Sequence, residues 1–558
     1  MVFVFVIVTM SASLRYNYIK PMCGILAIIG KGKDQAVAKA LSRRMSHRGP
    51  DESDLLTTPN GHLLAHERLS IMDLHSGRQP IFGSRAYMVH NGEIYNHQAL
   101  RNTLLSDCNF RTASDSEVIV HLFEKFGYDF VDRLDGDFAF VVIDQDDFIA
   151  ARDPLGVKPL YYGIDGRGRI YFASEMKAIA DQCNSFATFP PGHFYTPRTG
   201  FVKYYRPDYQ DCERSVQPPD FGLIREKLIQ ATRKRLMSDV PIGVLLSGGL
   251  DSSLTSAIAA RLLAAEGKKL HSFSIGLNSN APDAIAARKV AAFLGTTHHE
   301  VYFSIGQGIA VLKQLIWHLE TYDVTSVRAS VPMYFLAKAI TDTGVKVVLS
   351  GEGADEIFGG YLYFRNAPSS REFQQETIDR LQKLHTADLL RADKSTMAHG
   401  LEVRVPFLDR DFLSAAMAID PVQRQPGTHG GVEKYILRKA FDTPGKPYLP
   451  DEVLWRQKEQ FSDGVGYGWI EALLSYCASQ VTDAELESAA EQFPYNTPAT
   501  KEAYFYRRIF HLHFPQVAAA QTVRKWIPKW QHSQDPSGRA NAAHVLAHCK
   551  TQPSDLIV

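Results

Sequence analysis

The stretch SGGLDSS at residues 247–253 follows the apolar run VPIGVLL at 240–246 and precedes the run LTSAIAARLL at 254–263. An apolar strand, a glycine-rich turn and a helix start together direct backbone N–H groups and a helix dipole at an anion. Asp251 lies inside this turn and would repel a phosphate unless a cation lay between them. The stretch therefore predicts a site for a metal-bound phosphate within an α/β fold.

The composition of this turn favours a nucleotide site over a plain surface turn. Gly248 and Gly249 let the backbone curl without a Cβ clash, and Ser247 and Ser252 add hydroxyl donors. The turn lacks the spacing and the lysine of a Walker A motif. It resembles the pyrophosphate loop of ATP pyrophosphatases, which implies attack at the α-phosphate with release of pyrophosphate.

The second half of the chain alternates strands and helices. Strands are expected at 270–276, 299–303 and 346–349, and helices at 284–294 and 331–342. This alternation is typical of a parallel sheet with helices on both faces, in which ligands bind at the carboxyl ends of the strands. The residues expected at those strand ends are Leu245, Ile275 and Ser350.

A second stretch of the same kind, SGEGADE, occupies residues 350–356. Ser350 and Gly351 would allow close approach of a nucleotide, and the carboxylates of Glu352 and Asp355 follow directly. Such acids are usually solvated residues of a capped turn. Because a first anion loop lies on the same sheet edge, a role near ATP and its cation is the favoured interpretation.

Two basic residues are further candidates for contacts with phosphate. Lys458 lies in WRQKEQFSDG at 455–464 and would neutralise a leaving pyrophosphate. Arg328 lies in TSVRAS at 325–330. For each, a solvated surface charge is the alternative.

The first half of the chain is rich in strands and has two helices. Strands are expected at 24–30, 62–71, 86–90, 138–143, 148–152 and 169–174, and helices at 36–46 and 116–126, the second capped by Ser114 or Asp115. The stretch HNGEIYN at 90–96 predicts an Asn-Gly turn between a strand and a helix. This pattern favours a layered α+β domain.

Polar residues of this half suggest a site for a free amino acid. An arginine binds a carboxylate in a forked pair and an acid binds an ammonium group, while an Asn side chain with a Gly N–H forms an oxyanion hole. A cysteine such as Cys23 in MCGIL is by itself more often a small core residue.

Five motifs of the first half, CGI, HRGPD, LAHERLSI, NGEIYNH and SDSEV, resemble the class II glutamine amidotransferase domain. The resemblance spans most of residues 23–205 and implies an αββα fold of the N-terminal-nucleophile type. It implies that Cys23 is the nucleophile and that Asn91 and Gly92 form the oxyanion hole. It also implies a set of glutamine-binding residues: Arg68, Asn91, Gly92, Glu93 and Asp115.

The two halves together resemble the glutamine-hydrolysing asparagine synthetases, through MSDVPIGVLLSGGLDSS, HSFSIGL, ETYDVTSVRAS, VLSGEGADEIFGGYLYF, VRVPFLD and RQKEQFSDGVGY. The resemblance implies that aspartate attacks ATP to give β-aspartyl-AMP, which ammonia from an internal tunnel then converts to asparagine. It implies the small-molecule substrates aspartate, glutamine and ATP, a Mg²⁺ cofactor, a cytoplasmic location and a homodimer.

The same resemblance suggests roles in the second half. ATP would bind at Leu245, Ser247, Gly248, Gly249, Asp251, Ser252, Ile275, Ser350 and Gly351. Glu352 would serve as acid/base group and Lys458 would bind pyrophosphate. Asp251 and Asp355 would hold Mg²⁺, and Arg328 would contact either phosphate or aspartate.

The expected domains are an amidotransferase domain at 23–205, a linker at 206–219, a synthetase domain at 220–525 and a polar tail at 526–558. Residues 1–22 are expected to be an extension absent from the mature protein. Met22 directly precedes Cys23, so translation from Met22 and removal of that methionine would give Cys23 the free α-amine that its chemistry requires.

Composition excludes several other classes. Lys+Arg and Asp+Glu are both 61, and this balance argues against bulk binding to nucleic acid or to an anionic membrane. The six cysteines form no C-x-x-C pair, so neither a zinc site nor a disulfide framework is indicated. The apolar run at 2–8 is far shorter than a membrane span.

Three alternatives remain. A synthetase-fold relative would amidate or cyclise another substrate, as β-lactam-forming relatives do without a working cysteine pocket. An amidotransferase such as one making glucosamine phosphate would share the first half alone and lack the loop at 247. If the 22-residue extension is retained, the chain would be an ammonia-dependent or inactive regulatory homologue.

Overall fold

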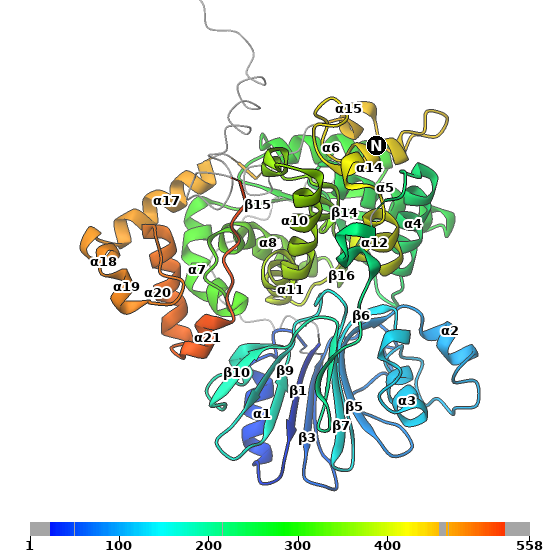
Figure 1. Cartoon of the computed structure of the whole chain (residues 1–558), viewed down its shortest axis with the longest axis vertical. Helices are drawn as coiled ribbons and strands as arrows, with labels where there is room; N and C mark the ends of the chain where they lie inside the picture. The colour runs from blue at the N-terminus through cyan, green and yellow to red at the C-terminus, as the bar shows by residue number, and fades with distance from the viewer. Residues whose placement is uncertain (1–22, 50, 215, 457–464, 467, 531–558) are drawn as a thin grey trace, which may run out of the picture.

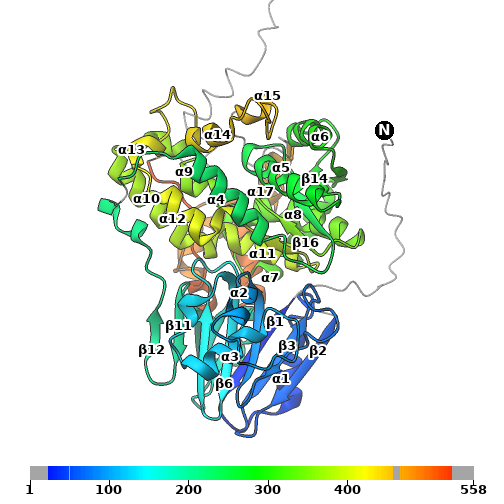
Figure 2. The same cartoon turned by 90° about the vertical axis from the view of Figure 1, so that its right-hand side faces the viewer.

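Two halves of the chain are stacked along the long axis of the molecule (Figure 1; Figure 2). The computed structural model describes residues 23–49, 51–214, 216–456, 465–466 and 468–530. The first half is a β-sandwich, and the second half is built around a parallel sheet. Among the described residues, no helix combines the length and the apolar character that a membrane crossing requires.

The first half contains two six-stranded antiparallel sheets, ordered β10-β8-β9-β1-β3-β2 and β12-β11-β7-β6-β5-β4. The strands of the first sheet are β1 (Gly24–Ile29), β2 (Glu52–Thr57), β3 (Leu63–Arg68), β8 (Tyr161–Ile164), β9 (Ile170–Ala173) and β10 (Ser185–Thr188). Those of the second are β4 (Ile81–Phe82), β5 (Tyr87–Ile94), β6 (Gly136–Asp144), β7 (Asp147–Arg152), β11 (His193–Thr196) and β12 (Gly200–Lys203). The helices are α1 (Gln35–Arg43), α2 (His97–Asn102) and α3 (Glu117–Phe126).

Alternation along β1 shows how these layers form. Ile25 and Ala27 pack into the core between the two sheets, whereas Leu26 and Ile28 join a cluster with Leu41 of α1 on the outer face. On the other sheet, residues of β5 and β6 pack outward against α3. The order helix, sheet, sheet, helix confirms the predicted αββα arrangement.

The second half contains a five-stranded parallel sheet of order β15-β14-β13-β16-β17. Its strands are β13 (Ile242–Leu245), β14 (His271–Gly276), β15 (Thr297–Tyr302), β16 (Val347–Leu349) and β17 (Glu402–Arg404). The strand order reverses between β13 and β16, and such a switch point forms the ligand crevice of doubly wound sheets. The predicted α/β fold is confirmed.

Helices surround this sheet and complete the second half (Figure 1). They are α4 (Phe221–Lys234), α5 (Leu250–Ala265), α6 (Pro282–Leu294), α7 (Ile305–Leu319), α8 (Val324–Asp342), α9 (Ala354–Phe358), α10 (Ser370–Lys383), α11 (Asp388–Met397), α12 (Arg410–Met417), α13 (Pro421–Arg424), α14 (Tyr435–Phe441), α15 (Asp451–Leu454), α17 (Gly468–Gln480), α18 (Asp483–Glu487), α19 (Ala489–Gln492), α20 (Lys501–His513) and α21 (Val517–Gln521).

Two local predictions in the first half were wrong. Asn91 and Gly92 lie inside β5 rather than in a turn, because β5 stays paired with β6 as far as Ile94. Gly92 has φ 136°, and a Cβ there would approach the carbonyl oxygen of Asp137 to 2.0 Å, so the glycine serves close strand packing. The α3 cap is Ser116 rather than Ser114 or Asp115, and it makes no side-chain cap hydrogen bond, since its hydroxyl pairs with His90 Nδ1 at 2.8 Å. The Asp115 carboxylate accepts from Ile94 N instead.

The predicted domain boundaries stay predictions. Between the halves, short 3₁₀ turns occupy Asp208–Gln210 and Cys212–Arg214, and Gln217 forms a parallel bridge with Ile419. Trp526, where the polar tail was expected to begin, is buried and its backbone N–H donates to Asp323. Residues 1–22 and 531–558 lie outside the described residues.

Candidate active sites

One cavity of the sandwich gathers the residues expected around the cysteine. It opens beside the ends of β1, β3 and β5. Six of its lining residues were predicted: Cys23, Arg68, Asn91, Gly92, Glu93 and Asp115. Three consecutive residues of one strand and three residues distant in sequence therefore meet at one place.

Cys23 is held at the start of β1 by contacts on both sides. Leu69 N donates to its Sγ at 3.4 Å, and Arg48 Nε donates to its carbonyl oxygen at 3.1 Å. Burial raises the pKa of the thiol to about 12. A thiol with this pKa needs a base before it becomes a nucleophile.

The side-chain amide of Asn91 has unused hydrogen-bonding capacity. It is fully buried, yet neither its side-chain oxygen nor its nitrogen has a hydrogen-bond partner among the described residues. Leaving a buried polar group unsatisfied costs about 1–3 kcal/mol, so such an amide facing a cavity is suited to a bound polar atom. Its position beside Gly92 fits an oxyanion hole.

The charged residues of this cavity are fixed by their surroundings. Arg68 donates to Glu52 at 2.7 Å and to the carbonyl oxygen of Asp73 at 2.6 Å. Burial raises the pKa values of Glu93 and Asp115, and Arg404 and the N–H of Ile94 respectively oppose that rise. One guanidinium group and two carboxyl groups in the same cavity are suited to bind the carboxylate and the ammonium group of a free amino acid.

The second half of the chain contributes residues to this cavity that were not predicted from the sequence. Glu402 of β17 is one of its lining residues, and Arg404 of the same strand is 2.9 Å from Glu93. The motif VRVPFLD contains Arg404 and pointed to this segment, but sequence alone does not reveal which residues meet across two domains.

The second candidate site lies at the switch point of the parallel sheet. The loop of Ser247 follows β13, and Ser350 and Gly351 follow the adjacent β16. The two loops touch, since a Cβ on Gly351 would come within 2.8 Å of Ser252 N. Gly248 has φ 75°, a conformation that favours glycine, and Ser247 Oγ lies 3.0 Å from Ser252 Oγ.

The other predicted members of this site surround the same edge. Leu245 ends β13 half-buried, and Ile275 is buried near the end of β14. Gly249 is the N-cap residue of α5, which carries Asp251 in its first turn. Lys458 lies outside the described residues, so its predicted contact with pyrophosphate stays a prediction.

Asp251 and Asp355 converge on Lys434, which the sequence analysis did not identify. The buried ammonium group of Lys434 forms ion pairs with both carboxylates, at 2.6 Å in the case of Asp355. A cation thus already lies between these two acids, and Mg²⁺ is commonly held by one or two carboxylates together with substrate phosphates. The described residues contain no cluster of three or more His, Cys, Asp or Glu suited to a metal.

Glu352 and Arg328 both have arginine–carboxylate partners. Arg391 Nη2 donates to Glu352 at 2.8 Å, and burial raises the pKa of Glu352 while Arg391 opposes that rise. Arg328 on α8 forms a forked pair with Glu502, at 2.9 and 2.6 Å, and both side chains are buried. Because this pair already engages the guanidinium, the predicted contact of Arg328 with substrate stays a prediction.

An apolar cluster connects the two candidate sites. Cys23 and Met72 pack against a buried group that includes Val244 of β13, Leu349 of β16 and Met397. The cluster therefore reaches from the cysteine cavity to the strands that precede the two nucleotide loops.

An N-terminal-nucleophile-type sandwich with a cysteine cavity, joined to a parallel sheet with two anion loops, defines a glutamine-dependent synthetase. Family models agree: a glutamine amidotransferase domain matches residues 22–195, and asparagine synthase matches residues 223–379 and 365–537. This chain belongs to the family of glutamine-hydrolysing asparagine synthetases.

Curated relatives are similar over nearly the whole chain. Asparagine synthetase [glutamine-hydrolyzing] 1 of Arabidopsis thaliana is 49% identical, over 94% of this chain and 95% of the relative. A probable asparagine synthetase [glutamine-hydrolyzing] of Dictyostelium discoideum is 50% identical, over 94% of this chain and 99% of the relative.

Proposed function

We propose that this chain synthesises L-asparagine from L-aspartate and ATP, with glutamine as the nitrogen donor. It is a carbon–nitrogen ligase whose other products are glutamate, AMP and pyrophosphate. Two features of one chain carry this function. The first is the cysteine cavity, in which the Asn91 amide has no partner among the described residues. The second is the sheet edge where the loops of Ser247 and Ser350 follow β13 and β16, which we call the nucleotide edge.

The first reaction releases ammonia in the cysteine cavity. Arg68 binds the glutamine carboxylate, and Glu93 and Asp115 bind its ammonium group. The α-amine of Cys23, freed by removal of the preceding residues, takes the thiol proton, because an α-amine with a pKa of about 7.7–8.0 is partly neutral near pH 7.

The thiolate then attacks the side-chain amide carbon of glutamine. Asn91 and the N–H of Gly92 stabilise the oxyanion. The carbon–nitrogen bond breaks, and ammonia leaves with the proton that the α-amine had accepted. Water hydrolyses the resulting thioester to glutamate and restores the thiol.

The second reaction activates aspartate at the nucleotide edge. A side-chain carboxylate oxygen of aspartate attacks the α-phosphorus of ATP, and the bond to pyrophosphate breaks. The phosphates are held by backbone N–H groups of the loop, including that of Gly249, and by the hydroxyl groups of Ser247 and Ser252. Glu352 acts as acid/base group. Lys458 would add positive charge for the pyrophosphate, and Arg328 would contact either phosphate or aspartate.

Mg²⁺ is the proposed cofactor, and Asp251 and Asp355 are the residues that would hold it. When bound, it supplies positive charge that neutralises the phosphates of ATP. Leu245, Gly248, Ile275, Ser350 and Gly351 shape the nucleotide edge.

Ammonia reaches the aspartyl adenylate through the interior of the protein. Neutral ammonia is the nucleophile, and water at neutral pH would protonate most of it. The apolar cluster that connects Cys23 with Val244 and Leu349 supports a dry route of this kind. Attack of ammonia on the adenylate carbonyl expels AMP.

The domain limits stated above, a homodimer and a cytoplasmic location complete the proposal. The five described cysteines are free thiols, which supports a reducing compartment. Sedimentation analysis of the purified chain tests the dimer.

Product analysis tests the function as a whole. Purified protein with aspartate, glutamine, ATP and Mg²⁺ is expected to form asparagine, glutamate, AMP and pyrophosphate in equal amounts. Formation of ADP and phosphate, or absence of asparagine with both glutamine and ammonia, would contradict the proposal.

A further inference from the structure

The synthetase half places a buried arginine directly behind the glutamine pocket. Strand β17 lies at the edge of the parallel sheet and pairs with β16, where Arg404 faces Leu349 in register. The Arg404 side chain is 1% exposed, and its Nη2 lies 2.9 Å from Oε1 of Glu93. A residue of the second half therefore contacts a residue of the first half that is proposed to bind the substrate.

This contact leaves half of the Glu93 carboxylate available. Oε1 faces Arg404, whereas Oε2 has no hydrogen-bond partner among the described residues although it is buried. Glu93 lines the cavity, and a buried carboxylate oxygen that lacks a donor is suited to an ammonium group. The contact of Oε1 with Arg404 is an ion pair, since Nη2 of Arg404 also has no hydrogen-bond partner among the described residues.

Arg404 matters more to Glu93 than to its other acidic neighbour. Its Nε donates to Glu402 at 2.5 Å, but Glu402 also has Lys158 at 2.7 Å. Without Arg404, Glu402 would still have a cation, whereas Glu93 would lose its ion pair. A role confined to neutralising Glu402 therefore does not account for the arginine.

The local charge balance also fits an incoming cation. The charged and titratable groups that face Glu93 are Arg404 and Glu402 from β17, Asp115 before α3, Lys158 after β7, Asp137 opposite on β6, and Cys23 and Arg68 around the cavity. Of those that act most strongly on it, Arg404 and Lys158 are the cations, while Asp115 and Glu402 are acids like Glu93 itself. Three carboxylates against two cations leave an excess that a substrate ammonium group would balance.

We propose that Arg404 is a positioning residue of the glutaminase reaction: the synthetase strand β17 supplies the guanidinium that aligns Glu93 for the ammonium group of glutamine. The glutamine site is then incomplete without the synthetase half. This inference rests on the proposed function. The backbone of Arg404 also accepts from Ser350 N at 2.9 Å, so the same residue touches the nucleotide edge.

The test compares glutamine hydrolysis by the full chain with that of Arg404→Gln and Arg404→Lys, between about pH 6 and pH 9. Arg404→Gln is expected to raise KM for glutamine about tenfold and to change kcat less than about threefold, because Cys23 and Asn91 are untouched. Burial raises the pKa of Glu93 and Arg404 opposes the rise, so without Arg404 the carboxyl ionises only at higher pH and KM should fall as pH rises.

Arg404→Lys separates positioning from mere charge. A lysine ammonium keeps the positive charge but cannot bind Glu93 and Glu402 in a fork, so KM is expected to rise about threefold, with less recovery at alkaline pH than in Arg404→Gln. If Arg404→Gln fails to fold, this variant gives the answer alone. A wild-type KM and pH profile in Arg404→Lys under those conditions would overturn the inference.

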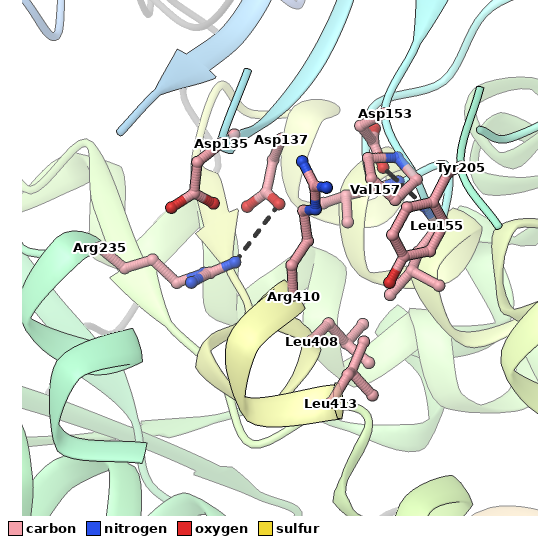
Figure 3. A pocket seen from close by; sticks show the side chains of 12 residues that line it. Asp135, Asp137, Asp153, Leu155, Val157, Tyr205, Arg235, Leu408, Arg410 and Leu413 are labelled. Carbon is pink, nitrogen blue, oxygen red and sulfur yellow. Dashed lines mark hydrogen bonds and ion pairs between the residues drawn. The ribbon is translucent and has the colours of Figure 1, made fainter. Parts of the chain in front are cut away.

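Arg235→Gln is the matched control. Arg235 is an equally buried arginine between the halves, paired with Asp409 at 2.9 Å and Asp137 at 3.5 Å, and it lines a different cavity (Figure 3). This variant should lower Tm and leave KM for glutamine unchanged. Equal KM effects in Arg235→Gln and Arg404→Gln would overturn the inference, whereas absence of glutaminase activity in the wild-type chain would contradict the proposed function instead.

Discussion

The cysteine cavity and the nucleotide edge treat their polar groups in opposite ways. In the cavity, the Asn91 amide and Oε2 of Glu93 are buried without a partner among the described residues. At the nucleotide edge, the Asp251 and Asp355 carboxylates are both bound by the Lys434 ammonium group. The antiparallel sandwich leaves polar atoms available for the amide and ammonium groups of glutamine, whereas two anionic side chains beside a phosphate site require a cation.

Replacing the proposed nucleophile should abolish the activity of the cysteine cavity and leave that of the nucleotide edge. Cys23→Ala is expected to reduce glutamine-dependent asparagine formation about ten-thousandfold or more, because no thioester forms. Ammonia-dependent formation should persist, since the nucleotide edge is intact. Asparagine measured with each nitrogen donor checks this, with the half-buried Cys183→Ala as control. Loss of both activities would show that the regions do not act separately.

The converse experiment removes one charge from the nucleotide edge. Asp251→Asn should slow aspartate-dependent pyrophosphate release about a thousandfold, because one of the two acids proposed to hold the cation is neutralised. Glutamine hydrolysis should continue. Asp342→Asn, an exposed acid at the end of α8, is the control. Equal losses of hydrolysis and pyrophosphate release would contradict the separation of sites.

Replacing the Asn91 amide should have a smaller effect, and it tests the oxyanion hole directly. Asn91→Ala should lower kcat of glutamine hydrolysis about a hundredfold, which is the usual effect of losing one oxyanion donor. Its KM should change less, because the amide acts mainly on the developing oxyanion. Asn184→Ala, at an exposed asparagine directly before β10, is the control. An unchanged kcat would mean that Asn91 is a structural residue.

The ion pairs of Lys434 with Asp251 and Asp355 predict an effect on the stability of the chain. Lys434→Met removes the ammonium group that pairs with Asp251 and Asp355 and should destabilise the chain by about 3 kcal/mol, since it breaks a buried ion pair. Mg²⁺ should raise Tm more in this variant than in the wild-type chain, because it replaces the missing ammonium group. Calorimetry with and without Mg²⁺ measures both effects.

The neighbouring Lys439→Met is the control for that experiment. Lys439 lies on α14, the helix for which Lys434 is the N-cap residue, and pairs with Asp442 at the surface. Its loss should change Tm little, because exposed ion pairs contribute little to stability. If Mg²⁺ raised Tm equally in Lys434→Met, Lys439→Met and the wild-type chain, the proposed cation site would be wrong.

Sequence reasoning was most successful where residues act locally. The loop at Ser247 follows from a strand, a glycine turn and a helix start, all within one short segment. The cysteine cavity was identified from motifs, and its six predicted members do meet. The prediction of a turn at Asn91 was wrong because Asn-Gly has a strong local turn preference, which pairing of β5 with β6 overrides.

The two fold classes and the family therefore follow from sequence motifs, as does the meeting of six predicted residues in the cysteine cavity. Only the packing of the chain shows two further contacts: within the second half Lys434 lies between Asp251 and Asp355, and Arg404 of that half reaches Glu93 of the first. Strand and helix patterns act over a few residues, whereas these buried ion pairs join side chains that are far apart in the sequence and form only once the chain is packed.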